Sequence, residues 1–173
     1  HIITLGQGAD TYASTSFGVD TVVANAGANT ISTGAGNDVI TSGTGSDTIN
    51  AGAGTDTVSY SGNFSNYSFT RSNNDLSIQD TRSVINGANT GIGDGSDVLT
   101  NIEYLQFADQ RVQESKVDVI KTYSGDFSDY KFYNKGDGVY QIKTNSGYDD
   151  ITGLPLLTFT GEATTSAFRD VSA

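Results

Sequence analysis

The feature that most constrains this chain is a nine-residue repeat that fills residues 5–59. Six units follow one another, and only Ser14 interrupts the register: LGQGADTYA, TSFGVDTVV, ANAGANTIS, TGAGNDVIT, SGTGSDTIN and AGAGTDTVS. A fixed period indicates a repeat architecture, in which each unit buries its apolar face by stacking on its neighbours. A Gly/Asp-rich flexible linker is excluded, because linkers do not hold an apolar residue at every ninth position.

Each unit divides into a turn and a short strand. The last three residues, such as Thr48-Ile49-Asn50, alternate polar, apolar and polar, which favours a strand with one side chain inward. The inward residue is Tyr, Val or Ile throughout, and we expect these residues to stack as a thin core: Tyr12, Val22, Ile31, Ile40, Ile49 and Val58.

The first six residues of each unit have the composition of an ion-binding turn. Glycine permits positive φ and a close approach of the backbone to an ion. Asp or Asn at the sixth position adds a side-chain oxygen, and calcium takes six to eight oxygen ligands at roughly 2.3–2.6 Å. The turns therefore favour a hard cation.

The pattern resembles the RTX (repeats-in-toxin) family, whose nonapeptide G-G-x-G-x-D-x-U-x binds calcium in a parallel β-roll. The first glycine of the motif is replaced throughout, and Ser16 and Asn25 replace the second in two units. The resemblance implies an all-β fold with a calcium-binding parallel β-roll of about three coils, and Ca2+ as the cofactor. Half a nonapeptide at 95–100 adds Asp97 to the metal-site residues that the resemblance implies. The full set is Gly6, Gly8, Asp10, Gly18, Asp20, Gly27, Asn29, Gly34, Gly36, Asp38, Gly43, Gly45, Asp47, Gly52, Gly54, Asp56 and Asp97.

The resemblance also implies which turns share an ion. In the RTX family two nonapeptides make one coil, and each ion lies between turns that are two repeats apart. Carried onto this sequence, the pairs are Asp10 with Asn29, Asp20 with Asp38, Asn29 with Asp47, and Asp38 with Asp56. Asn29 keeps an oxygen but lacks a charge, so we expect its two sites to be weaker.

Composition restricts the partners. The formal charge is −11, and the nine Lys and Arg residues form no cluster, which argues against nucleic acid. The absence of cysteine excludes disulfides and zinc–thiolate sites. We find no apolar run long enough to span a membrane and no signal peptide. RTX proteins usually leave bacteria by type I secretion through a C-terminal signal, so the resemblance implies a secreted, extracellular location, and the chain has the look of a fragment.

The rest of the chain contains an internal duplication. TYSGDFSDY (122–130) matches SYSGNFSNY (59–67) at six of nine positions, with an offset of 63 residues. GYDDITGLPLLTF (147–159) aligns without gaps to GSDVLTNIEYLQF (95–107), with an offset of 52. Hairpins are expected at 67–78 and 130–144, a strand at 101–110, a loop at 81–94 and a polar connector near 108–120.

We therefore predict three segments: a β-roll at 1–59, a first β module at 60–112 that caps the roll, and a second, duplicated β module at 113–173. The half-nonapeptide at 95–100 is expected to continue the strand ladder of the roll. The equivalent stretch at 147–152 is expected to repeat this one layer further on.

Aromatic residues recur at matching positions of the two modules, which favours a duplicated core over a carbohydrate platform. Acids near the turns, such as Asp94 and Asp149-Asp150, are either further calcium ligands or solvated turn residues. The only histidine is His1, and no nucleophile motif is present, so we expect no catalytic residues and no enzyme.

Two functions are consistent with these patterns. The first is a calcium-binding RTX module of a larger secreted bacterial protein, which folds on calcium binding after export and stabilises the parent. The alternative is an extracellular carbohydrate-binding or adhesin module that carries RTX repeats. The expected partners are calcium ions and other domains of the parent, with a polysaccharide under the alternative.

Overall fold

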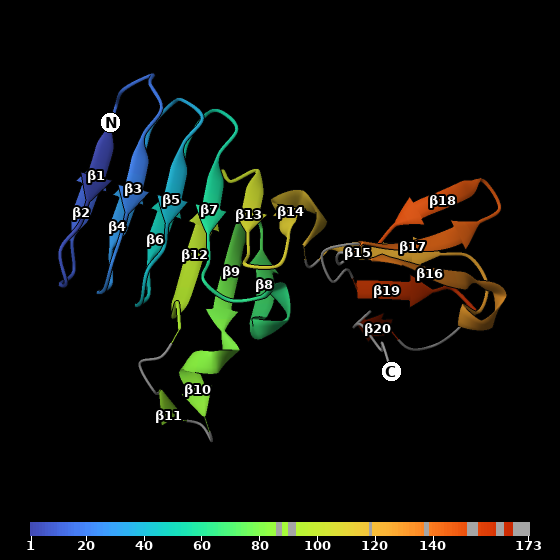
Figure 1. Ribbon diagram of the computed structural model, residues 1–173. Helices are drawn as coiled ribbons and strands as arrows, with labels where there is room; N and C mark the ends of the chain where they lie inside the picture. Colours follow the sequence, from blue (N-terminus) through green and yellow to red (C-terminus); the bar gives the residue numbers. More distant parts are fainter. Residues whose placement is uncertain are drawn as a thin grey trace. The chain divides into compact units, whose positions relative to one another are not determined.

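The computed structural model describes residues 1–85, 88–89, 93–117, 119–136, 139–151, 156–161 and 165–167. The chain forms two compact units, His1–Glu114 (unit 1) and Ser115–Ala173 (unit 2) (Figure 1). Within the described residues all regular structure is strand or short 3₁₀ helix, and no helix there is long and apolar enough to cross a membrane. The predicted all-β class is confirmed.

The nonapeptide repeats of unit 1 form a parallel β-roll. Each repeat contributes one three-residue strand, and successive strands alternate between two sheets, as Figure 1 shows. The strands are β1 (Ile2–Thr4), β2 (Thr11–Ala13), β3 (Thr21–Val23), β4 (Thr30–Ser32), β5 (Val39–Thr41), β6 (Thr48–Asn50) and β7 (Thr57–Ser59). Odd-numbered strands lie in one sheet and even-numbered strands in the other, because the turn at the start of each repeat reverses the chain.

The register of the roll follows the repeat. Val39 lies opposite Thr57, so strands that are two nonapeptides apart pair in parallel with an offset of 18 residues. Thr11 lies opposite Thr30, an offset of 19, because Ser14 adds one residue to the first coil. The predicted stacking of strands two repeats apart is confirmed.

The centre of each strand is buried between the two sheets. Five of the six predicted core residues are at most 1% exposed, namely Val22, Ile31, Ile40, Ile49 and Val58. Tyr12 on an outer coil is half-buried. The core is one side chain thick per strand, so each coil gains most of its burial from the coils beside it.

The second half of unit 1 continues both sheets of the roll. β12 (Ser96–Thr100) pairs in parallel with β6, and β13 (Tyr104–Gln106) pairs in parallel with β7. The predicted hairpin is present as β8 (Tyr67–Ser72) and β9 (Asp75–Asp80), and β9 pairs antiparallel with β12. The half-nonapeptide therefore supplies a strand to the ladder of the roll, as predicted.

Aromatic side chains fill the space beneath this hairpin. The rings of Tyr60 and Phe107 stack with centroids 5.7 Å apart, and Phe64 packs edge-on against Phe107 at 5.1 Å. Phe64 opens the 3₁₀ helix η1 (Phe64–Asn66). Tyr60, Phe64, Tyr67 and Phe107 are all less than 9% exposed, so here the aromatic residues form a core.

Two predicted loops contain regular structure. The segment 81–94 includes η2 (Thr81–Ser83) and a two-stranded pair, β10 (Val84–Ile85) and β11 (Ala88–Asn89), while its other residues 86–87 and 90–92 lie outside the described part. The connector near 108–120 includes an antiparallel edge strand, β14 (Arg111–Gln113), followed by η3 (Glu114–Lys116). The polar composition of β14 concealed it, because Val112 alone is buried.

Unit 2 contains two three-stranded sheets. One has the order β15 (Ile120–Tyr123), β19 (Leu156–Phe159), β20 (Thr165–Ala167). The other has the order β16 (Lys131–Gly136), β17 (Val139–Thr144), β18 (Gly147–Asp150), with η4 (Phe127–Asp129) before it. The core consists of Tyr123, Ile142, Ile151, Leu157 and Phe159.

Unit 2 repeats the strand pairing of the second half of unit 1. Val58 lies opposite Leu105 where β7 meets β13, and Lys121 lies opposite Leu157 where β15 meets β19. Ile78 lies opposite Asp97 in unit 1, as Ile142 lies opposite Asp149 in unit 2. The predicted duplication therefore extends to the register of the sheets.

The two copies differ on one side. In unit 1, the roll strands β5 and β6 lie beside β7 and β12. In unit 2, no described strand occupies the corresponding places beside β15 and β18. The expectation that 147–152 continues the roll was wrong for β18, which pairs antiparallel with β17 in a sheet of its own unit.

Candidate metal centre

The turns of the roll stack into two ladders, each with one acid or amide side chain per coil. The first ladder, which leads into the odd-numbered strands, contains Asp20, Asp38, Asp56 and Glu103. The second ladder, which leads into the even-numbered strands, contains Asp10, Asn29, Asp47 and Asp97. Since strands two repeats apart are paired, consecutive members of a ladder lie one above the other.

Within each ladder, every backbone N–H donates to the side chain of the next coil. In the first ladder, Asp20 N–H donates to Asp38 Oδ1 at 2.7 Å, and Asp38 N–H to Asp56 Oδ1 at 2.7 Å. In the second, Asn29 N–H donates to Asp47 Oδ1 at 2.8 Å. One side-chain oxygen of each accepting residue thus fixes the spacing of neighbouring coils.

The ladders extend into the module that follows the repeats. Asp47 N–H donates to Asp97 Oδ1 at 2.9 Å, and Asp56 N–H donates to Glu103 Oε2 at 2.7 Å. Asp97 was predicted from the sequence, but Glu103 was missed because it does not belong to a Gly-x-Asp motif. The available signal was position: Glu103 comes directly before β13, as Asp56 comes directly before β7.

The second oxygen of most ladder carboxylates has no hydrogen-bond partner. These oxygens are the buried Oδ2 atoms of Asp38, Asp47, Asp56 and Asp97, whose residues are at most 2% exposed. A buried carboxylate oxygen without a partner is costly, because burial removes its hydration. Each ladder therefore has an oxygen on several coils that requires a cation or a proton.

The pKa values of these acids express the same cost. Burial raises the pKa of Asp97 to about 8 and that of Asp56 to about 6, with further increases from neighbouring carboxylates. Burial also raises the pKa of Asp47. Burial favours the neutral form of an acid, so without a cation these groups hold protons to an unusually high pH.

Two positions differ from the rest of the ladders. Both oxygens of Asp20 accept hydrogen bonds, Oδ1 from the amino group of His1 at 3.1 Å and Oδ2 from the hydroxyl of Tyr12 at 3.0 Å. Asn29 accepts from Asp10 N–H and donates its amide to the carbonyl of Ala24 at 3.2 Å. Neither side chain leaves a buried oxygen without a partner.

Glycine is required where a turn lies directly on the turn of the coil before it. At Gly52, φ is +88°, and a Cβ would overlap the carbonyl oxygen of Gly34. Similar contacts to the preceding turn occur at Gly27, Gly34, Gly36, Gly43, Gly45 and Gly54. Gly8 and Gly18 have no such contact, and a Cβ on Gly6 would meet only the carboxylate of Asp10.

The side chains alone do not form a complete metal site. Within the part of the chain that the structure describes, no three His, Cys, Asp or Glu side chains are grouped closely enough to hold a metal. The turns, however, bring a backbone carbonyl close to a carboxylate at Gly36, where an added Cβ would lie 2.5 Å from the carbonyl oxygen of Gly18 and 3.1 Å from Oδ1 of Asp38. A donor set of carboxylate and carbonyl oxygens suits calcium, which accepts many hard oxygen ligands in flexible geometry.

Comparison with known proteins agrees with this geometry. The family model of the RTX calcium-binding nonapeptide repeat, in four copies, matches residues 14–49 and 35–63. No curated protein matches the chain. RTX nonapeptide repeats bind calcium ions, and Ca2+ is accordingly the cofactor of the roll. The matched residues, 14–63, contain β3–β7 and their turns, and this part of the chain carries RTX calcium-binding nonapeptide repeats.

Proposed function

We propose that unit 1 is a calcium-dependent folding module of a larger secreted protein, in which calcium replaces the protons on the buried ladder acids. The proposed side-chain ligands are Asp20, Asp38 and Asp56 with Glu103 in the first ladder, and Asp10, Asn29, Asp47 and Asp97 in the second. Backbone carbonyls of the glycine-containing turns complete the donor set. The proposed role is structural rather than enzymatic.

The single observation that carries this proposal is the row of buried carboxylate oxygens without partners. Asp38, Asp47, Asp56 and Asp97 each have one oxygen on a backbone N–H and the other on no partner. An acid that served only as a turn cap would leave its second oxygen in water. Here four such oxygens are inside the molecule, where a divalent cation would satisfy them.

Folding should depend on the ion because the roll has little else to stabilise it. Its strands are three residues long, and each buries one central side chain. Ordering a residue costs about 1–2 kcal/mol of backbone entropy, so burial of one apolar side chain in each nine-residue repeat offsets only a small part of the cost of ordering that repeat. Metal binding free energy therefore becomes folding free energy.

This dependence fits a protein that is made in one compartment and works in another. Extracellular calcium modules bind at ~10⁻⁴–10⁻³ M, so such a roll stays open in a low-calcium cytosol and folds outside the cell. The net charge of −11 adds repulsion in the metal-free chain. Export by type I secretion is the route that fits this order of events.

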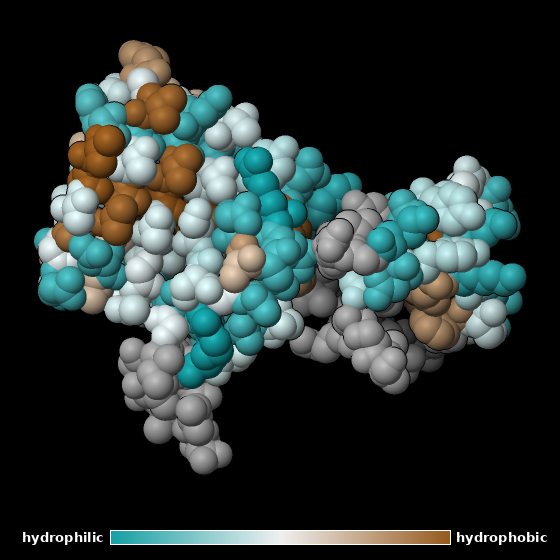
Figure 2. All heavy atoms as spheres, in the orientation of Figure 1, coloured by the Kyte–Doolittle hydropathy of each residue, from teal (hydrophilic) through white to brown (hydrophobic). Residues whose placement is uncertain are grey.

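Stabilisation of a parent protein requires a surface for its other domains. Figure 2 shows apolar side chains gathered over the first strands of the roll. Ile2 is 87% exposed and Phe17 is 91% exposed. Val39, which is also exposed, lies in the same cross-strand row as Ile2, because both are opposite Thr21. Exposed apolar groups of this kind mark interaction sites, and we assign this surface to contact with the parent.

The test is residue-resolved NMR of the whole chain in EGTA and then in millimolar calcium. We expect amide signals of β1–β7 to be collapsed in EGTA and dispersed in calcium, with magnesium a poor substitute because it demands a tighter octahedron. The double variant Asp38→Asn, Asp56→Asn should need far more calcium, whereas Asp126→Asn, an exposed acid outside the ladders, should behave as wild type. Dispersed β1–β7 signals in EGTA would contradict the proposal.

A further inference from the structure

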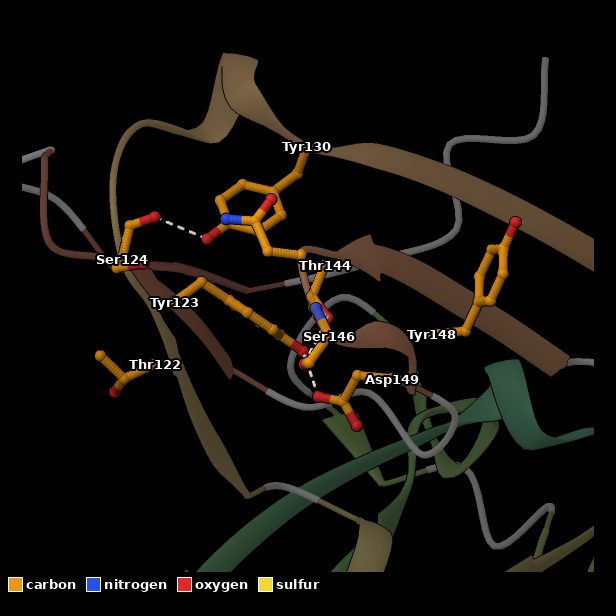
Figure 3. Close-up of a pocket in the computed structure, with 9 residues that line it drawn as sticks. Thr122, Tyr123, Ser124, Tyr130, Thr144, Ser146, Tyr148 and Asp149 are labelled. Carbon is orange, nitrogen blue, oxygen red and sulfur yellow. Dashed lines mark hydrogen bonds between the residues drawn. The ribbon is translucent and has the colours of Figure 1, made fainter.

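Unit 2 contains a pocket of about 520 Å³ at the ends of β15, β17 and β18 (Figure 3). Its volume lies within the range of small-molecule sites, roughly 300–1,000 Å³. Tyr148 stands at one side, Tyr123 and Tyr130 stand at the other, and Ser146 and Asp149 lie between them, as Figure 3 shows.

The duplicated fold identifies what fills the same place in unit 1. Tyr67 and Ser61 are the counterparts of Tyr130 and Ser124, with an offset of 63 residues. In unit 1 these two side chains surround the guanidinium of Arg82, which donates to Ser61 Oγ at 3.0 Å and to Tyr67 Oη at 3.1 Å. An arginine therefore occupies the position that is a pocket in unit 2.

Two carboxylates hold that arginine. Arg82 donates to Asp80 at 2.6 Å, and Asp94 accepts a hydrogen bond from Ser61 at 2.7 Å and lies 3.6 Å from the guanidinium. The register places Thr144 at the position of Asp80, since these residues end β17 and β9, and the offset of 52 places Ser146 at the position of Asp94. Only Asn145 and Ser146 connect β17 to β18, so unit 2 has no counterpart of Arg82.

With these replacements, unit 2 has a space lined mainly by hydroxyl groups where unit 1 has a filled ionic cluster. Thr144 and Ser146 are linked to each other at 3.1 Å. The one carboxylate of the lining, Asp149, already pairs with Lys121 at 3.1 Å and accepts from the hydroxyl of Tyr123 at 2.6 Å. A cation bound in this pocket would have no counterparts of the two acids that hold Arg82 in unit 1. An anion would be repelled by the carboxylate of Asp149.

The lining instead suits a neutral ligand with many hydroxyl groups. Serine and threonine hydroxyls both donate and accept hydrogen bonds. The ring of Tyr148 is held edge-on against Tyr133 with centroids 5.6 Å apart, and the residue is 60% exposed. It offers a fixed apolar face beside polar groups, which matches the C–H face and hydroxyl rim of a sugar ring.

We propose that this pocket binds a neutral hexose unit of a polysaccharide. The site is independent of the calcium ladders, because its lining comes from unit 2 alone. The sequence alone suggested polysaccharide binding as an alternative function of the whole chain. This proposal assigns that binding to one pocket and one class of sugar.

The test is NMR titration of the whole chain with maltohexaose, cellohexaose and mannohexaose, and with hexagalacturonate as the charged comparison. At least one neutral hexasaccharide should give saturable shifts of amides in 122–130 and 144–149, while hexagalacturonate gives none. The shifts should persist in EGTA, which separates this proposal from the calcium function.

Variants then locate the site. Tyr148→Ala and Ser146→Asp, the latter restoring the acid of unit 1, should each weaken binding at least tenfold. Val98→Ala, a change at an exposed apolar residue of unit 1, should leave it unchanged. The proposal is wrong if none of the three neutral sugars binds saturably, if both pocket variants bind as wild type, or if the acidic sugar binds as tightly.

Discussion

Units 1 and 2 use the same strand module in two settings. In unit 1 a coil of the roll pairs with the module, and Asp97 accepts a hydrogen bond from the backbone N–H of Asp47 in that coil. In unit 2 the equivalent acid, Asp149, faces the ammonium of Lys121, which stands where unit 1 has Val58. We therefore expect the module itself not to need calcium. The proposed dependence would arise where its acid joins a ladder of other acids.

The largest expected effect is the removal of calcium, which should separate the two units. In EGTA we expect the ladder acids to repel one another and the roll to open, while unit 2, which has its own apolar core and whose Asp149 pairs with Lys121, stays folded. Limited proteolysis should degrade the roll, residues 1–59, and leave unit 2 intact. Equal degradation of both units would show that unit 2 depends on the roll.

The next effect concerns a matched pair of glycines. Gly95 and Gly147 are equivalent and both have positive φ, +83° and +136°, so alanine costs each roughly 1–2 kcal/mol. A Cβ at Gly95 would also overlap the carbonyl oxygen of Gly45 in the roll, whereas nothing lies within 4 Å at Gly147.

Gly95→Ala should therefore destabilise unit 1 in calcium by about 3 kcal/mol in total, a loss typical of severe backbone strain. Gly147→Ala should cost unit 2 only the smaller amount. Urea unfolding followed at amides of each unit measures both. Equal losses would mean that the coil does not pack closely on the module.

A smaller effect distinguishes positions within the ladders. Asp38 lies between two other acids of its ladder, Asp20 and Asp56, and has a buried oxygen without a partner, whereas the side chain of Asn29 is fully hydrogen-bonded. Asp38→Ala should weaken calcium binding roughly tenfold, or about 1.4 kcal/mol, more than Asn29→Ala. Calorimetric titration gives both affinities, and similar losses would contradict the unequal roles of these two positions.

The smallest effect is a pH dependence confined to unit 1. The folded, calcium-free roll holds protons on Asp97 and Asp56 up to about pH 8 and 6, whereas unfolded acids release them near 3.8. The folded state thus binds more protons in this window, and its stability falls as pH rises from about 4 to 8.

Acidification of metal-free protein to pH 5 should therefore restore part of the roll, as measured by circular dichroism. Asp97→Asn should reduce the pH dependence, because its amide needs no proton. A metal-free roll that gains stability between pH 5 and 8 would exclude proton binding by these acids.

The sequence predicted the parts of the molecule that repeat. A period of nine with an apolar eighth position predicted the strands and their apolar core, and the resemblance to the RTX family predicted the alignment of Asp38 with Asp56. Glu103 was not predictable, because it joins the ladder through the pairing of β13 with β7 rather than through a motif. The pocket of unit 2 was hidden for a related reason: unit 2 lacks the arginine and two acids that fill this place in unit 1, and the difference becomes visible only once the two modules are in register.

The register of the roll also has a consequence for the order of folding. Adjacent coils pair residues 18 apart, whereas β6 and β12 pair Thr48 with Val98, which are 50 apart. Closing the longer loop costs only about 0.9 kcal/mol more, because loop entropy grows with the logarithm of length. The hairpin of β8 and β9 needs no long loop and presents six-residue strands.

We therefore expect the hairpin module to form first and the coils to add to it one after another toward the N-terminus. Pulsed hydrogen exchange during calcium-induced refolding should protect β8 and β9 before β1 and β2. If the roll grows from the folded hairpin module, that module fixes the register of the first coil and each coil fixes the next. Near-identical repeats can then stack without a register shift of one coil.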